Sequence, residues 1–129
     1  MPTNFEDFNK RVRIKTKLFS REIPLAHIHA VAFDALGRVV FKTPVDTGRA
    51  RGGWQINLNE VGTGAGPKSK SGDRVLSAGL ARINRAGIDD TIYITNSVPY
   101  IRDLERGSSS QAPSGMVRLT LVEMKGVLK

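Results

Sequence analysis

The stretch IPLAHIHAVAFDALGRVVFK, residues 23–42, is the most regular part of the chain and decides its fold. Apolar residues cover most of its circumference on a helical wheel, while four polar residues gather in one narrow stripe. We therefore predict a helix here, with Pro24 in its first turn, where the missing N–H costs nothing. The helix should end at Thr43 and Pro44, because a residue before proline is disfavoured in the α region. The polar stripe consists of His27, Asp34, Arg38 and Lys42.

The wide apolar face of this helix indicates what should pack around it. A helix that is apolar over most of its surface must be buried on more than one side. We expect a sheet on one side and a neighbouring subunit on another. Asp34 and Arg38 stand four residues apart, which predicts an ion pair worth about 0.3 kcal/mol.

Downstream, alternating sequences predict two strands. Trp54, Ile56 and Leu58 alternate with polar residues, the pattern of a half-buried strand. Residues 116–128 alternate only at their start, so a strand and a helix both remain open there. The other expected elements are a turn at 45–48, a strand at 52–61, a flexible basic loop at 62–73, a helix at 75–86 ended by Gly87, a second strand at 91–96, one or two helical turns at 100–106 capped by Gly107, and a polar loop at 108–114.

The N-terminal residues form a separate basic segment, 1–22. Phe5, Phe8 and Val12 have the spacing of a short amphipathic helix, and 11–18 alternates basic with mostly apolar residues. That alternation predicts a strand with one cationic face, although the basic side of a helix is an alternative. The fold class is therefore α+β. We expect a single compact domain over 23–129, with a long buried helix packed on a small, mostly antiparallel sheet and with extended loops.

Composition limits the function. The chain has 129 residues, 20 Lys and Arg against 12 Asp and Glu, a formal charge of +8, and no cysteine. The absence of cysteine excludes a disulfide framework, a Cys-ligated zinc site and a thiol nucleophile. The positive charge points to an acidic partner, such as nucleic acid, or to an assembly that neutralises it. Neither a membrane span nor a secretory signal is expected, so we predict an intracellular protein.

Catalytic motifs are weak. Asp46, Thr47 and Gly48 spell the triplet of aspartic proteases, which need two such carboxylates sharing a proton, so one copy would require a homodimer. Arg49 follows directly and favours the charged carboxylate, which opposes proton sharing. We favour an ordinary Asx-type turn. The histidines of 27–29 and the glycines of 62–66 likewise lack the spacing of a metal site or a phosphate loop, so we predict no enzyme activity, no cofactor and no metal.

Nucleic-acid binding is a stronger alternative. Basic residues cluster in the N-terminal segment, again after the long helix and in the glycine-rich loop, and on one face they would form a footprint for phosphates. No helix-turn-helix, zinc finger or stacking platform accompanies them, so sequence-specific binding is not predicted. The residues concerned are Lys10, Arg11, Arg13, Lys15, Lys17, Arg21, Arg49, Arg51, Lys68, Lys70 and Arg74.

Three segments together carry a family resemblance. They are TPVDTGRAR at 43–51 with Trp54 just beyond, IYITNSVPY at 92–100 with LERG at 104–107, and SQAPSGMV at 110–117. In this order and spacing they resemble the tail-completion or neck protein family of tailed bacteriophages. The resemblance extends from about residue 31 to residue 121, so that the N-terminal segment and the 62–73 loop lie outside it.

The resemblance implies a small α+β structural protein of the virion that joins the head to the tail. It implies a homo-oligomeric ring around the DNA channel, in contact with other connector and tail-tube proteins, assembled in the bacterial cytoplasm and without enzyme activity or cofactor. The motif residues expected to serve assembly are Thr43, Pro44, Asp46, Thr47, Gly48, Arg49, Trp54, Asn96, Pro99, Tyr100, Glu105, Gly107, Gln111, Ala112 and Pro113. The residues expected to face DNA or to dock onto a partner are Arg11, Arg13, Lys15, Lys17, Lys68 and Lys70.

Overall fold

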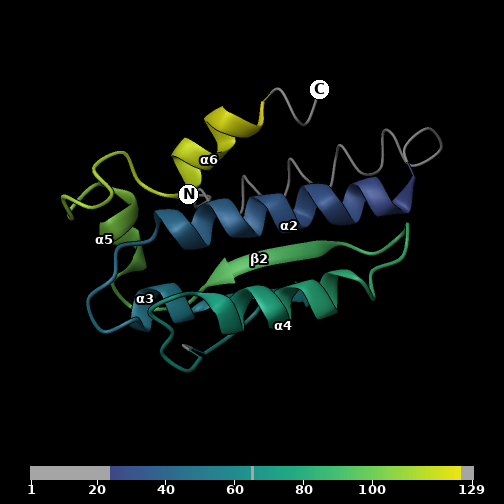
Figure 1. Ribbon diagram of the computed structural model, residues 1–129, viewed down its shortest axis with the longest axis horizontal. Helices are drawn as coiled ribbons and strands as arrows, with labels where there is room; N and C mark the ends of the chain where they lie inside the picture. Colours follow the sequence, from purple (N-terminus) through teal and green to yellow (C-terminus); the bar gives the residue numbers. More distant parts are fainter. Residues whose placement is uncertain (1–23, 65, 126–129) are drawn as a thin grey trace.

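The computed structural model describes residues 24–64 and 66–125, and it has the predicted α+β class (Figure 1). The helix expected near Phe5 and the strand or helix expected over 11–18 lie outside the described residues. Within the described part, the elements are α2 (Leu25–Lys42), α3 (Arg49–Gly52), β1 (Trp54–Leu58), α4 (Asp73–Ile83), β2 (Ile92–Asn96), α5 (Ile101–Glu105) and α6 (Val117–Met124).

Helix α2 confirms the main prediction. Pro24 is its N-cap rather than a residue of its first turn, and Thr43 ends it in an extended conformation before Pro44. The buried face of the helix consists of Ile28, Ala32, Ala35, Leu36, Val39 and Val40. On the opposite face, Ala26 and Ala30 are exposed and Phe41 keeps 59% of its surface accessible. Burial of this second face by a neighbouring subunit stays a prediction.

The sheet has two antiparallel strands in the part of the chain that the structure describes. Trp54 pairs with Asn96, and Leu58 pairs with Ile92. Strand β1 is shorter than the expected 52–61, because the chain up to Gly52 is helical and Asn59 turns away with a φ of 65°. Alternation places Trp54 and Ile56 in the core, as predicted.

Helices α2 and α4 pack together over the buried face of this sheet. Gly79 makes the approach possible, since a Cβ at this position would collide with the Leu36 side chain and press on Ile56. Helix α4 begins at Asp73 and ends at Ile83, with Asn84 as its C-cap. The prediction that Gly87 ends this helix was therefore wrong by a full turn.

The C-terminal stretch is helical rather than extended. Helix α6 lies along the C-terminal half of α2, where the Glu123 carboxylate pairs with Arg38 at 2.9 Å and with Lys42 at 2.6 Å. The predicted pair of Asp34 with Arg38 also forms, at 3.1 Å. The lysine and arginine bonds hold the pKa of the Glu123 carboxyl below its ordinary value.

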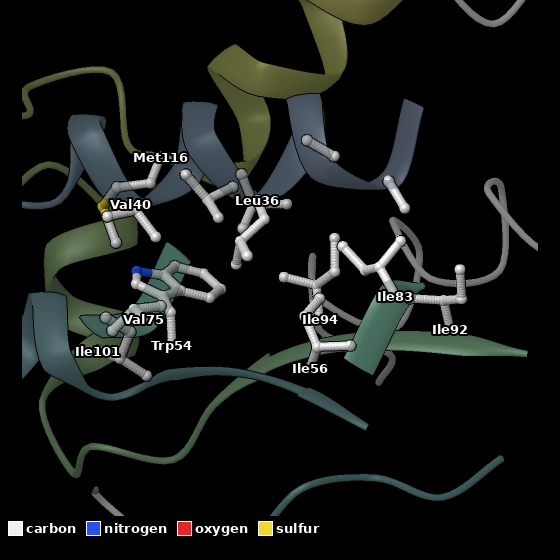
Figure 2. Close-up of a cluster of buried hydrophobic side chains, with 14 of the residues drawn as sticks. Leu36, Val40, Trp54, Ile56, Val75, Ile83, Ile92, Ile94, Ile101 and Met116 are labelled. Carbon is white, nitrogen blue, oxygen red and sulfur yellow. The ribbon is translucent and has the colours of Figure 1, made fainter. Parts of the chain in front are cut away.

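A single apolar core joins these elements. Figure 2 shows the Trp54 indole between the sheet and α2, with Val40 and Leu36 above it. Met116 and Ile101 extend the core towards the C-terminal helices, and Ile83 and Ile92 close its other end. Aliphatic side chains supply most of this core, as the low aromatic content predicts.

Candidate functional site

The three motif segments, although separated in sequence, meet at one end of the long axis, around α3 and α5 (Figure 1). Inside the domain, Thr43 and Trp54 form a link within the first segment. The indole Nε1 donates to the Thr43 hydroxyl at 2.7 Å, and that hydroxyl donates to the Val39 carbonyl at 2.6 Å. Thr43 is buried, so this chain of bonds satisfies the polar atom of a core tryptophan and fixes the end of α2.

Asn96 forms a second internal link. Its side-chain nitrogen donates to the Ala50 carbonyl at 2.8 Å, and its side-chain oxygen accepts the Val98 N–H at 3.0 Å. The residue is buried, and its two bonds join α3 to the turn that leads to Pro99. The first and second motifs are therefore connected through a buried side chain that binds backbone groups of both.

Gln111 connects the third motif to the first. Its side-chain oxygen accepts the Val45 N–H at 3.0 Å, and its side-chain nitrogen donates to the Val45 carbonyl at 3.3 Å. A side-chain amide can pair with a backbone amide in this way only when its carbonyl and amino groups both face the chain. The pair joins the 108–114 loop to the turn after α2, and the neighbouring Ala112 is buried.

Glu105 organises the start of α6. Its carboxylate accepts the backbone N–H groups of Met116, Val117 and Arg118 at 2.9, 2.8 and 3.0 Å, and the Arg118 Nε at 3.1 Å. These are donors that a helix start leaves unsatisfied, and a carboxylate there also matches the helix dipole. Gly107 has a φ of 93° and lies against the Pro113 carbonyl, where a side chain would not fit.

Arg51 binds backbone carbonyls at this end of the domain. Its guanidinium donates to the carbonyls of Phe41 at 3.3 Å and Thr43 at 3.0 Å, and to that of Lys70 at 2.9 Å. These bonds satisfy carbonyls at the C-terminus of α2, where a cation also complements the dipole. Burial lowers the pKa of Arg51. We predicted a basic residue for nucleic acid here, whereas the side chain is committed to backbone carbonyls.

An open cleft of about 690 Å³ lies between these segments. Across it, the Arg49 guanidinium lies over the Tyr100 ring, 5.7 Å from the ring centroid, which is the geometry of a cation–π contact. Tyr100 remains 37% exposed. The cleft is lined by Pro44, Val45, Asp46, Thr47, Gly48, Arg49, Ala50, Lys68, Tyr100, Leu104, Ser109 and Gln111.

Asp46 lies on the predicted turn. It is exposed, the Thr47 hydroxyl next to it accepts the Arg49 N–H at 3.3 Å, and Gly48 has a φ of 89°. The structure adds the short helix α3 directly after this turn, which the sequence did not predict. Pro99 is exposed just before Tyr100.

Lys68 and Lys70 lie at the same end of the molecule, and both are exposed. Two hydrogen bonds hold the segment that carries them: the Ser69 backbone N–H donates to the Gly48 carbonyl at 2.9 Å, and the Arg74 guanidinium donates to the Pro67 carbonyl at 2.7 Å. These anchors are polar, consistent with a loop that has no apolar residue to bury. Its mobility stays a prediction. The candidate residues Arg11, Arg13, Lys15 and Lys17 lie outside the described residues.

Within residues 24–64 and 66–125, neither the histidines nor the helices indicate a metal site or a membrane span. The His29 ring nitrogen Nε2 lies 2.7 Å from the Ala86 carbonyl. Across 24–64 and 66–125, no group of three potential metal ligands comes together. No described helix is both long enough and apolar enough to cross a bilayer.

Comparison with known proteins finds no protein family model, no curated protein and no solved structure that matches this chain. The family resemblance therefore stays a prediction from the residues quoted above.

Sequence analysis missed several residues that build the site. Arg118 supports the carboxylate of Glu105, and Val45 supplies the backbone that Gln111 binds. Neither has a local pattern that marks it, because each acts through a partner more than ten residues away. Ser109, which lines the cleft, carried no signal of its own either, and Leu104 lay within the quoted segment 104–107 without being singled out.

Proposed function

We propose that this chain is a structural virion protein of a tailed bacteriophage, which forms a ring at the head–tail junction, joins the tail to the head and surrounds the DNA channel. One observation carries the proposal: the three family-like segments converge on a single cleft at one end of an α+β domain. If these three distant segments build one surface, a single function accounts for all three motifs.

The chemistry of that surface suits assembly. The polar motif residues are largely committed to backbone groups, through Gln111 on Val45 and Asn96 on Ala50, so they fix the shape of the chain. The cleft keeps the Arg49 guanidinium over the Tyr100 ring, beside the apolar residues Val45 and Leu104 of its lining. Arginine and tyrosine are enriched among the residues that dominate protein–protein binding energies.

The proposal includes partners and a place. The partners are further copies of this chain in the ring, connector and tail-tube proteins above and below it, and DNA that passes without sequence-specific contact. The protein would be assembled in the bacterial cytoplasm and located in the neck or tail of the virion. Neither a cofactor nor a catalytic step is part of this function.

The test is in vitro joining of heads and tails made by a phage that lacks this gene. Purified chain should convert separate heads and tails into joined particles, counted by electron microscopy, and should form rings of a defined mass. Gln111→Ala, which releases Val45 at the cleft, should impair joining, whereas the exposed Ser77→Ala on α4 should not. Wild-type protein that leaves heads and tails separate would refute the proposal.

A second function, a DNA-binding accessory protein without sequence specificity, is favoured by one observation. Arg49, Lys68 and Lys70 are exposed at the same end of a chain with a net charge of +8. Phosphate contacts would make the logarithm of the affinity fall linearly with the logarithm of salt concentration, with a slope of about −0.9 per contact. A shallow slope, or no binding, removes this alternative.

A further inference from the structure

We propose that the cleft binds an acidic turn of a second copy of this chain, formed by residues 87–90. The contact is head-to-tail, so each copy offers its cleft to one neighbour and its acidic turn to the other. The inference rests on the proposed function, because it specifies the contact from which the ring would be built. It follows from how the turn is held, from the charges of the cleft and from the positions of both.

Hydrogen bonds to one of its carboxylates hold the acidic turn, and its other carboxylate is exposed. The Asp90 carboxylate is used internally, since it accepts the Gly87 N–H at 2.7 Å and the Asn59 side-chain N–H at 3.0 Å. These two bonds, Asn59 first, lower the pKa of Asp90. Asp89 is exposed and makes no ion pair or hydrogen bond within residues 24–64 and 66–125. Ile88 beside it remains 38% exposed.

The cleft has the complementary chemistry. The Arg49 guanidinium is held over Tyr100 without a carboxylate partner in the described part of the chain, and the exposed Lys68 lies on the same lining. Val45 and Leu104 give it apolar surface. An isoleucine followed by a carboxylate therefore finds an apolar contact and a cation side by side. The volume of about 690 Å³ falls in the range of about 300–1,000 Å³ typical of ligand sites.

Charge distinguishes this occupant from others. The basic stretch 10–21 of the N-terminal segment carries Lys10, Arg11, Arg13, Lys15, Lys17 and Arg21, so this stretch would be repelled by the cations of the cleft. Asp46 also lines the cleft and disfavours a long acidic run, but it leaves room for a single carboxylate. A turn with one outward carboxylate and one apolar side chain fits both conditions.

The positions of the two patches set the symmetry. The cleft lies beside α3 and α5 at one end of the long axis, whereas the turn between α4 and β2 lies at the other (Figure 1). A surface that meets a different surface of its neighbour makes a heterologous contact, which closes into a ring when the rotation allows and otherwise extends into a filament. The same contact can thus be repeated around an axis without a second interface.

Charge reversal tests the pairing. At low salt, Arg49→Glu and Asp89→Arg should each weaken self-association at least about tenfold in sedimentation velocity, because each places like charges opposite each other. The double variant, or an equimolar mixture of the two single variants, should recover wild-type association, since the charges again match. Arg82→Glu, an exposed arginine on α4 outside both patches, is the control. Failure of the double variant to recover association would overturn the pairing.

Cross-linking tests adjacency directly, because the chain has no cysteine of its own. Oxidation of the double variant Lys68→Cys, Asp89→Cys should give a ladder of covalent oligomers. Each single-cysteine variant can give only dimers. The pair Lys68→Cys, Ser77→Cys keeps one cysteine in the cleft and moves the other away from the acidic turn, and it should give no ladder. If the Lys68 and Asp89 positions yield no ladder at any concentration up to the solubility limit, the inference is wrong.

The outcomes separate this inference from the proposed function. A ladder together with failure to join heads and tails would support the contact and refute the function. Joined particles without a ladder would support the function and refute the contact. If nucleic acid occupies the cleft instead, DNA binding will be lost with Arg49→Glu and kept with Asp89→Arg, and both variants will self-associate like the wild type, which also overturns the contact.

Discussion

Among the acidic residues within 24–64 and 66–125, Glu105 is the buried one, and removal of its carboxylate should destabilise the domain most. Glu105→Ala leaves the N–H groups of Met116 and Val117 without their acceptor, and both residues are buried. A buried donor without a partner costs about 1–3 kcal/mol. Two of them give about 4 kcal/mol, a large share of the roughly 5–15 kcal/mol that holds a typical domain folded. For this length, the melting temperature should fall by roughly 12–20 °C.

Urea unfolding followed by the fluorescence of Trp54, the single and buried tryptophan, measures this loss. Glu105→Gln can keep the one oxygen that accepts from both Met116 and Val117, and it loses the acceptor of Arg118, so it should lose less than half as much free energy of unfolding. The control is Asp103→Ala on the same helix, whose exposed carboxylate lies 4.0 Å from Arg106 and should contribute under about 1 kcal/mol. If Glu105→Ala and Asp103→Ala lower the free energy of unfolding equally, the helix-capping role is refuted.

Three further perturbations test the fold. Thr43→Val removes the acceptor of the Trp54 indole and should cost about 1–3 kcal/mol in urea unfolding, and no change would mean that the indole finds another partner. Gly79→Ala should cost about 1–3 kcal/mol, because its Cβ meets the neighbouring helix. The control Gly37→Ala has open space around its Cβ and should gain up to about 1 kcal/mol in helix propensity. Equal effects of the two substitutions would contradict the packing described. The Glu123 pKa is lowered in the folded state, so its contribution is present above the ordinary glutamate pKa and is lost as the pH falls through the lowered value. Because the two ion pairs of Glu123 are partly exposed, they should contribute under about 1 kcal/mol. Glu123→Gln should flatten that part of the plot of unfolding free energy against pH. An unchanged plot would exclude the ion pairs as its source.

The elements that local periodicity could predict are those whose burial is set by their own sequence. Helix α2 has an apolar face that only a helix can produce, and strand β1 alternates from Trp54 to Leu58. Boundaries were harder to predict. Gly87 looks like a helix terminator, yet helix α4 already ends at Ile83, and Gly87 instead donates its N–H to the Asp90 carboxylate.

Long-range contacts decided what the sequence left open. Residues 116–124 alternate enough at their start to allow a strand, but the carboxylate of Glu105, more than ten residues earlier, binds the first N–H groups of a helix there. Helix α3 depends similarly on Asn96, which binds the Ala50 carbonyl from 46 residues away. The motif residues could be singled out from the sequence, whereas their backbone partners could not, because no local spacing encodes them.

The close approach at Gly79 lets helices α2 and α4 pack directly together, so that the pair forms one unit of fixed length. No side chain intervenes there, and the Leu36 side chain of α2 occupies the space that a Cβ at position 79 would need. Helix α2 has 18 residues, which at 1.5 Å per residue gives about 27 Å between the cleft and the far end of the domain. In an array built by joining these ends, this helix pair would set the distance between the two contact sites of each copy, whereas the loops at the ends would set which surfaces meet.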